Sequence, residues 1–276
     1  TPFGGNSLAV FTDANGLNAG QMLRLTQELR HFESIFLEVE GDSVRARIFD
    51  LFGELPFAGH PMLGAAAMLH RASGDAENRC TTFRLGQNRS VVIDTERRGQ
   101  AFIARMDQGQ PEFIASASDD DRQEIAAALR LDSADLAPLP IETVSTGLAY
   151  LIVPLRSGLD RARPARADLE AMLGRWSASF VYLLDVDRLE GRTWNNDGVL
   201  EDIATGSAAG PAAAYGLKHK FVAADKPTTL RQGRFVGRPS EIIMTAFGSS
   251  AHIERVEVAG AVAFVGGGSI LTPRPS

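Results

Sequence analysis

The sequence predicts an α+β fold of two pseudo-symmetric lobes, on three observations. Strand-like runs outnumber helical ones along the chain. One segment recurs, with changes, 147 residues later. Both copies continue into a stretch rich in Gly and Ala, which lets strands approach a helix closely on nearly every side. We therefore expect each lobe to wrap a sheet around a buried central helix, near residues 60–72 in one lobe and 207–220 in the other.

The first lobe is expected to span residues 1–112. A helix is predicted at Gln21–Arg30, where Met22, Leu25 and Leu29 share one face. The stretch Gly109–Ala117 holds Gly, Pro and small polar residues, which are typical of an irregular boundary. The predicted strands are Leu8–Phe11, Ser34–Val39, Val44–Phe49, Thr81–Leu85, Ser90–Asp94 and Ala101–Met106.

The second lobe is expected to span residues 113–276. Helices are predicted at Asp120–Leu131 and Asp168–Arg175. The last predicted strand can belong to the second lobe or return to the first lobe. The predicted strands are Leu148–Pro154, Ser179–Leu184, Glu241–Ala246, Ile253–Val258 and Val262–Val265.

The internal repeat is the most informative pattern. Glu54 and Glu201 each stand five residues before a glycine, Gly59 or Gly206, and an Ala triplet begins six residues after each glycine. Gly and Ala are common residues, but the shared Glu and the half-chain spacing indicate a duplicated lobe. An Arg-x-aromatic step also precedes each copy, with a slip of two residues: Arg47–Phe49 and Arg192–Trp194.

The repeated turn predicts two helix N-termini that can hold an anion. Pro61 suits the first helical position, so His60 is the predicted N-cap; Ser207 is the predicted N-cap of the second helix, with Pro211 in its first turn. If the lobes face each other, the two positive helix ends converge on one cleft and bind a carboxylate. The alternative is that such helices serve only to let strands pack closely. A titratable residue near each helix N-terminus, His60 and Asp202, favours a functional site.

Glu33 is a candidate proton carrier. Strand alternation places it on the same face as Ile35 and Leu37. A carboxylate among apolar neighbours loses solvation, so we expect its pKa to rise until it can carry a proton near neutral pH. The alternative is an edge-strand glutamate turned to water.

Composition excludes several classes of function. With 44% hydrophobic and 22% charged residues the chain has a soluble globular profile, and its net charge of -6 argues against a nucleic-acid surface. No apolar run approaches the roughly 20 residues that span a bilayer. The one cysteine, Cys80, rules out an internal disulfide and favours the cytoplasm. The five histidines lack metal-site spacing, and Gly266–Gly268 precedes no helix, so neither a metal nor a dinucleotide is expected.

Four motifs of this chain resemble the phenazine-biosynthesis-like (PhzF-like) family, relatives of diaminopimelate epimerase. The resemblance reaches from near the start to about residue 240. It implies a mixed sheet or barrel around a central helix in each lobe, an active site between the lobes, homodimers and no cofactor. The motifs are Phe3–Phe11, Glu54–Pro61, Glu201–Pro211 and Gln232–Ser240.

The resemblance also implies an activity, namely a cofactor-independent isomerase that moves a proton on a small carboxylate-bearing metabolite. Glu33 would be the single acid/base, with His60 and Asp202 binding and polarising the substrate. The chain departs from the family pattern at Arg30–Ser34 and Phe49–Gly53, which leaves the substrate open. The residues implied to supply amide or hydroxyl donors to the substrate are Gly59, Gly206 and Ser207.

Two other functions are weighed against this one. A non-catalytic small-acid-binding or interaction protein on the same fold stays open, because the surroundings of Glu33 are altered. A two-base epimerase would need a thiol in each lobe. Neither residues 58–61 nor residues 203–208 contain a cysteine, so that alternative is disfavoured.

Overall fold

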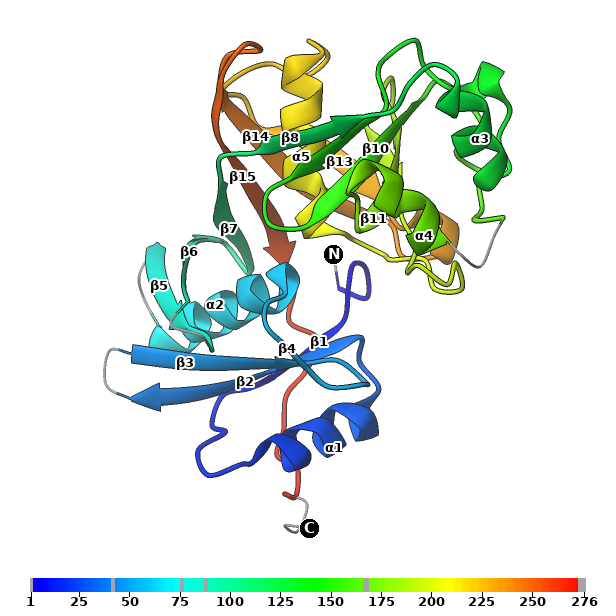
Figure 1. Ribbon diagram of the computed structural model, residues 1–276. Coiled ribbons are helices and arrows are strands. Elements are labelled where there is room, and N and C mark those ends of the chain that lie inside the picture. Colours follow the sequence, from blue (N-terminus) through cyan, green and yellow to red (C-terminus); the bar gives the residue numbers. More distant parts are fainter. Residues whose placement is uncertain (1, 41–42, 75–76, 87–88, 166–168, 273–276) are drawn as a thin grey trace. The chain divides into compact units, whose positions relative to one another are not determined.

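The computed structural model describes residues 2–40, 43–74, 77–86, 89–165 and 169–272. Over these ranges the protein is a mixed α+β structure, with five α-helices and a large mixed sheet (Figure 1). The chain packs as two units: Thr1–Met106 with Ala259–Ser276 forms unit 1, and Asp107–Val258 forms unit 2. None of the helices in the described ranges has the length and apolar character needed to span a membrane.

Unit 1 has the strand order β1-β2-β3-β5-β6-β7, with β4 paired to β3. The pairs β1–β2 and β3–β5 are parallel, and the pairs β2–β3, β5–β6 and β6–β7 are antiparallel. Its strands are β1 (Leu8–Phe11), β2 (Glu33–Glu40), β3 (Ser43–Phe49), β4 (Glu54–Leu55), β5 (Asn78–Arg84), β6 (Ser90–Arg98) and β7 (Ala101–Gly109).

Two helices cover opposite faces of the unit 1 sheet: α1 (Ala19–Leu29) and α2 (Gly59–Ser73). The alternation of β2 explains this arrangement, because Ile35 and Leu37 pack in the core around α2 while Phe36 packs in the core beneath α1. The contact between α2 and β1 is so close that a Cβ at Gly64 would lie 2.4 Å from Leu8 Cδ2. A larger residue at that position of the helix would therefore require the Leu8 side chain to shift.

Unit 2 has the strand order β15-β14-β13-β12-β11-β10-β9-β8. The pairs β10–β11 and β12–β13 are parallel. Its strands are β8 (Glu112–Ser116), β9 (Glu142–Ser145), β10 (Ala149–Leu155), β11 (Phe180–Asp185), β12 (Glu190–Arg192), β13 (Thr228–Gln232), β14 (Ser240–Gly248) and β15 (Ile253–Val262).

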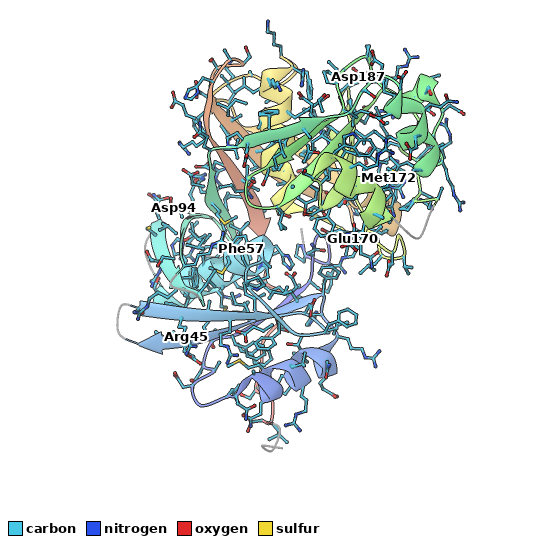
Figure 2. All side chains as sticks on the ribbon, in the orientation of Figure 1. Arg45, Phe57, Asp94, Glu170, Met172 and Asp187 are labelled. Atoms are coloured by element: carbon cyan, nitrogen blue, oxygen red, sulfur yellow. The ribbon has the colours of Figure 1, made fainter. Side chains whose placement is uncertain are left out.

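Helix α5 (Gly206–Lys218) is enclosed in the core of unit 2 and is buried from Ala208 to Leu217. Tyr150 and Ile152 of β10 face α5, whereas the alternate residues of β10 pack with α3 (Asp121–Ala128) and α4 (Leu169–Leu173). Met172 of α4 is part of that second core (Figure 2). The small Ala and Gly side chains of α5 allow strands on several sides to reach its backbone.

Both Gly-Ala helices begin earlier than the sequence predicted. The N-cap of α2 is Ala58 and that of α5 is Thr205, so the predicted caps His60 and Ser207 are wrong by two residues. Ala58 and Thr205 are the last residues outside helical geometry, and the glycine after each turns directly into the helix. Each helix begins at the same position of the repeat, since Gly59 and Gly206 are 147 residues apart.

Pro211 is also placed differently from the prediction. It is the sixth residue of α5, so it lies beyond the first turn. A residue without an N–H at this position removes the hydrogen bond to the carbonyl of Ser207. Pro61, by contrast, is the third residue of α2, where an N–H has no intrahelical partner.

Other elements differ at their edges. The expected irregular boundary Gly109–Ala117 is wrong, because it contains β8. Helix α3 is shorter than predicted, and Val262 ends β15 instead of opening a new strand. The predicted helix from Asp168 begins outside the described residues and continues as α4 and a 3-10 turn, Gly174–Trp176. The strands β4, β8, β9, β12 and β13 were not predicted.

Candidate active-site clusters

In unit 1 the structure brings together Glu33 and His60. Helix α1 ends at Leu29, and the left-handed backbone of the next residue, Arg30 (φ 53), turns the chain toward β2, whose first residue is Glu33. Its side chain shares the face of Ile35 and Leu37 and points toward the start of α2, where His60 is the second residue. Glu33 is only 8% exposed, so the alternative of a glutamate turned to water is wrong.

The two side chains form an acid–base pair in which Glu33 is buried and His60 is half-buried. His60 Nδ1 lies 3.2 Å from Glu33 Oε2, and their side chains are 23% and 11% exposed. A carboxylate and an imidazole at this distance can pass a proton between them or hold one in common. The predicted ligand Gly59 directly precedes His60 as the first residue of α2.

In unit 2 the structure brings together Asp202, Gly206 and Ser207 around the start of α5. Asp202 lies in the short segment between the β-bridge residue Glu201 and the helix. Its backbone N–H donates to the carbonyl of Thr193, 3.0 Å away. Its carboxylate accepts a hydrogen bond at Oδ2 from the hydroxyl of Thr205, 2.6 Å away.

The buried side-chain amide of Gln232 forms hydrogen bonds to the segment between Asp202 and Thr205. Gln232 is 1% exposed and makes four hydrogen bonds. Its Nε2 donates to the carbonyl of Asp202 (2.9 Å) and to the hydroxyl of Thr205 (2.8 Å). Its Oε1 accepts from the backbone N–H of Thr205 (3.3 Å) and the hydroxyl of Tyr182 (3.1 Å). The next residue, Gly233, has φ 83 and leaves no room for a Cβ.

The hydroxyl of Ser207 also has a buried partner, the phenol of Tyr150 on β10. The two oxygens are 2.7 Å apart. Burial raises the pKa of Tyr150 far above its usual value, and the negative charge of Asp202 adds to the rise. The phenol therefore stays protonated, and it holds the Ser207 hydroxyl in a short hydrogen bond in which either oxygen can donate.

Neither helix start is covered by a side chain of its N-cap residue. Ala58 has no polar atom to offer, and Thr205 uses its hydroxyl on Asp202 instead of capping the helix. Gly59 and Gly206 both have negative φ, so backbone strain does not require glycine there. Among the described residues nothing lies within 4 Å of a Cβ built on Gly206. These features leave backbone amides at both helix starts for an anionic ligand.

An ion pair precedes the helix in each unit. In unit 1 Arg47 donates to Glu54 through Nε and Nη2, at 2.8 and 2.5 Å. In unit 2 Arg192 donates to Glu201 through the same atoms, at 2.9 and 2.6 Å. The repeated Arg and Glu of the sequence are therefore partners in space in both units.

Comparison with known proteins decides the family. A model of the phenazine biosynthesis-like protein family, PhzC-PhzF, matches residues 1–268. The chain belongs to this family. It is similar to the trans-2,3-dihydro-3-hydroxyanthranilate isomerase of Pseudomonas fluorescens, at 33% identity over 98% of this chain and 95% of that protein. It is also similar to the uncharacterized isomerase YddE of Escherichia coli O157:H7, at 30% identity over 94% of this chain and 91% of that one.

Solved structures agree with this PhzF-family isomerase in fold. A predicted epimerase from Pseudomonas aeruginosa superposes with a TM-score of 0.84 at 44% identity, covering 96% of this chain and 95% of that one. A phenazine biosynthesis protein of the PhzF family from Bacillus anthracis superposes with a TM-score of 0.81 over 95% of this chain and 92% of that one. At 23% identity, the second likeness concerns the fold alone.

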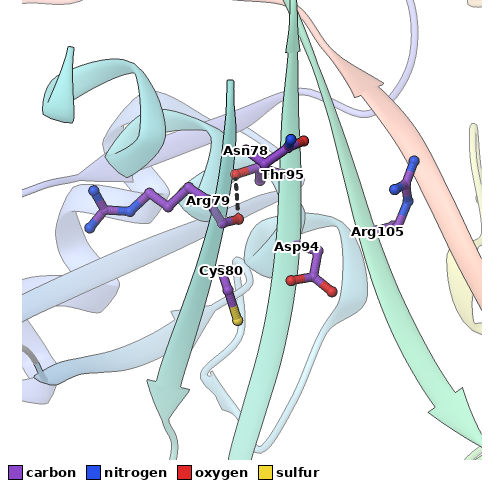
Figure 3. Close-up of a pocket in the computed structure, with 6 residues that line it drawn as sticks. All are labelled: Asn78, Arg79, Cys80, Asp94, Thr95 and Arg105. Atoms are coloured by element: carbon purple, nitrogen blue, oxygen red, sulfur yellow. Dashed lines mark hydrogen bonds between the residues drawn. The ribbon is translucent and has the colours of Figure 1, made fainter. Parts of the chain in front are cut away.

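The PhzF-family isomerase has a shallow hollow elsewhere in unit 1, of about 300 Å³, beside β5, β6 and β7 (Figure 3). None of the three predicted site residues of unit 1, Glu33, Gly59 and His60, lines it. Cys80 does, and burial together with Asp94 raises the pKa of its thiol, which disfavours the reactive thiolate. Within the described part of the chain no three His, Cys, Asp or Glu side chains cluster as metal ligands.

Three residues of this isomerase were given no role from the sequence: Thr205, Gln232 and Tyr150. Thr205 and Gln232 both stand inside motifs that the sequence singled out, so their position was a usable signal. Tyr150 lies in a predicted strand, and no pattern connects it with Ser207, 57 residues away.

Proposed function

We propose that this isomerase moves a proton on a small carboxylate-bearing metabolite without a cofactor, and that Glu33 is the single acid/base. The observation that carries the proposal is the pair of buried Glu33 and half-buried His60, 3.2 Å apart. A glutamate beside an imidazole can take a proton from one substrate carbon and return it to another. His60 orients the carboxyl group and polarises the substrate.

The unit 2 cluster is assigned to substrate binding. Asp202 orients the substrate, while Gly206 and Ser207 supply an amide and a hydroxyl donor to its carboxylate. Support comes from the uncapped start of α5, where the backbone amides and the helix dipole favour an anion. Gly59 supplies the corresponding amide at α2. That the two helix starts serve one cleft stays a prediction.

The first substrate to test is trans-2,3-dihydro-3-hydroxyanthranilate, which gives the Pseudomonas fluorescens relative its name. It carries a carboxylate, and its isomerisation requires a proton to leave one carbon and reach another. The departures at Arg30–Ser34 and Phe49–Gly53 make a related carboxylate the second choice.

We further propose that the two units descend from one duplicated lobe, each a mixed sheet around a central helix. The matching ion pairs support this. Glu54 lies seven positions after Arg47, whereas Glu201 lies nine positions after Arg192, so the two-residue slip of the sequence repeat falls between the Arg and the Glu. The same two residue types pair in both units despite this slip. A homodimer working in the cytoplasm completes the proposal.

The test is a solvent-deuterium experiment on the wild type and on Glu33→Gln, which keeps the shape but cannot hold and release the proton. We expect deuterium on the product carbon in the wild type, and at least about a 100-fold loss of kcat in the variant with nearly normal binding. Glu38→Gln, a change on the same strand, serves as the matched control and should behave as the wild type. Wild-type turnover by Glu33→Gln would remove Glu33 from the mechanism. A wild type that binds carboxylates but exchanges no proton would favour the non-catalytic alternative.

A further inference from the structure

The hydrogen bonds around Asp202 have only one possible direction. The backbone N–H of Thr205 can only donate, so the atom of Gln232 facing it, at 3.3 Å, must be the oxygen Oε1. The carbonyl of Asp202 can only accept, so the atom facing it, at 2.9 Å, must be the nitrogen Nε2. Two independent backbone groups therefore orient the Gln232 amide.

This orientation decides what the Thr205 hydroxyl does. Nε2 of Gln232 also points at that hydroxyl, at 2.8 Å, and the hydroxyl must accept from it. Its own proton is then directed to Oδ2 of Asp202, 2.6 Å away. Tyr182 adds a second donor to Oε1 of Gln232 and holds the amide from behind.

The same hydroxyl is withdrawn from the task that its position predicts. A Thr at an N-cap normally accepts a hydrogen bond from a backbone N–H of the first helical turn. Thr205 makes no such bond. In unit 1 the corresponding residue, 147 positions earlier, is Ala58, and the residue corresponding to Asp202 is Leu55. Of the two copies of the repeat, only the one with an aspartate therefore has the hydrogen bonds from Gln232 to Thr205 and from Thr205 to Asp202.

We infer that Thr205, oriented by Gln232, is a positioning residue that holds the Asp202 carboxylate in one orientation for the substrate. The inference rests on the proposed role of Asp202. A carboxylate oxygen that accepts a short hydrogen bond from a fixed hydroxyl is restricted in its rotation. Thr205 is buried and its hydroxyl is engaged by Gln232 and Asp202, so we assign its effect on turnover to Asp202.

The test compares Thr205→Val, which keeps the shape without the hydroxyl, with Thr205→Ser, which keeps the hydroxyl. With trans-2,3-dihydro-3-hydroxyanthranilate as substrate, Thr205→Val should lose about 10- to 100-fold in kcat/KM, the range for a hydrogen bond to a charged group. Thr205→Ser should recover most of it. A merely structural Thr205 would instead lower thermal stability in step with activity.

A double-mutant cycle separates this inference from the proposed function. If Thr205 acts through Asp202, the combination of Thr205→Val with Asp202→Asn should be no slower than Asp202→Asn alone. Losses that multiply would overturn the inference. If Asp202→Asn itself is fully active, the proposed role of Asp202 fails, and the inference with it.

A measurement without substrate covers the case of an inactive wild type. In protein labelled with ¹³C at the aspartate carboxyl groups, the Asp202 signal is assigned by its loss in Asp202→Asn. We expect this signal to move in Thr205→Val and to return in Thr205→Ser. A signal that is unchanged in Thr205→Val would show that the hydroxyl does not act on the carboxylate.

Discussion

Arg192 and Glu201 form a doubly hydrogen-bonded ion pair that is almost fully buried, with side chains 0% and 8% exposed. The guanidinium also donates to the carbonyls of Leu159 and Ala162. It also contacts the rings of Trp194 and Phe235, with Cζ 4.7 and 4.3 Å from their centroids. This pair fixes the chain immediately before Asp202.

Removal of Arg192 should therefore destabilise the protein far more than removal of its counterpart in unit 1. Arg192→Ala leaves Glu201 buried without its charge partner, and we expect a loss of about 3–5 kcal/mol in the free energy of unfolding. Arg47→Ala breaks the more exposed pair with Glu54 and should cost about 1 kcal/mol or less. Urea unfolding of both variants measures the difference. Equally small losses of unfolding free energy in the two variants would contradict the burial of the pair between Arg192 and Glu201.

Gly206→Ala should damage binding without damaging the fold. The added methyl group meets nothing within 4 Å among the described residues, and the backbone needs no positive φ. Thermal unfolding should stay unchanged, while KM rises by about 10-fold or more, because the methyl group occupies space meant for the ligand. Gly174→Ala, also at the first position of a short helix with open space around it, is the control. An unchanged KM would show that no ligand approaches Gly206.

Tyr150→Phe should act on KM and leave the shape of the pH profile intact. The phenol of Tyr150 holds the hydroxyl of Ser207 at 2.7 Å, and its loss frees that hydroxyl to rotate. Since burial raises the pKa of Tyr150, the phenol stays protonated at any pH at which the protein is assayed. Tyr215→Phe, which removes a buried phenol bonded to the carbonyl of Pro140, is the matched control. A pH profile altered only in Tyr150→Phe would mean that this phenol titrates.

Activity should survive prolonged chelation. The proposed proton transfer uses the carboxylate of Glu33 and the imidazole of His60, and neither step calls for a metal. Turnover is measured before and after dialysis against a chelator. Loss of activity that zinc restores would overturn the metal-free mechanism.

The sequence predicted the strands best where one face of the strand is buried. Residues 44–48 and 90–94 alternate strongly, and both fall inside observed strands, β3 and β6. The strand β9 was missed because Glu142, Thr143 and Val144 are all buried, so no alternation marks it. β12 is only three residues long, too short for a period to be recognised.

Helix starts were less predictable than the helices themselves. The runs of Gly and Ala in α2 and α5 indicated buried helices, and the repeat indicated that the two correspond. Pro61 and Ser207 suggested later starts, because both residue types favour the first positions of helices. In the fold the non-helical backbone ends at Ala58 and Thr205, so the glycines join the helices.

By itself the sequence determined the family, the two Gly-Ala helices and the candidates Glu33, His60 and Asp202, because these depend on local motifs and on a fixed spacing. Only the tertiary structure decided which side chains form hydrogen bonds around these candidate residues. Gln232 reaches Thr205 across 27 residues, and β13 must lie beside the start of α5 for that hydrogen bond to form. The hydrophobic periodicity of the sequence does not predict this contact, because the contact arises from the packing of strands around a helix.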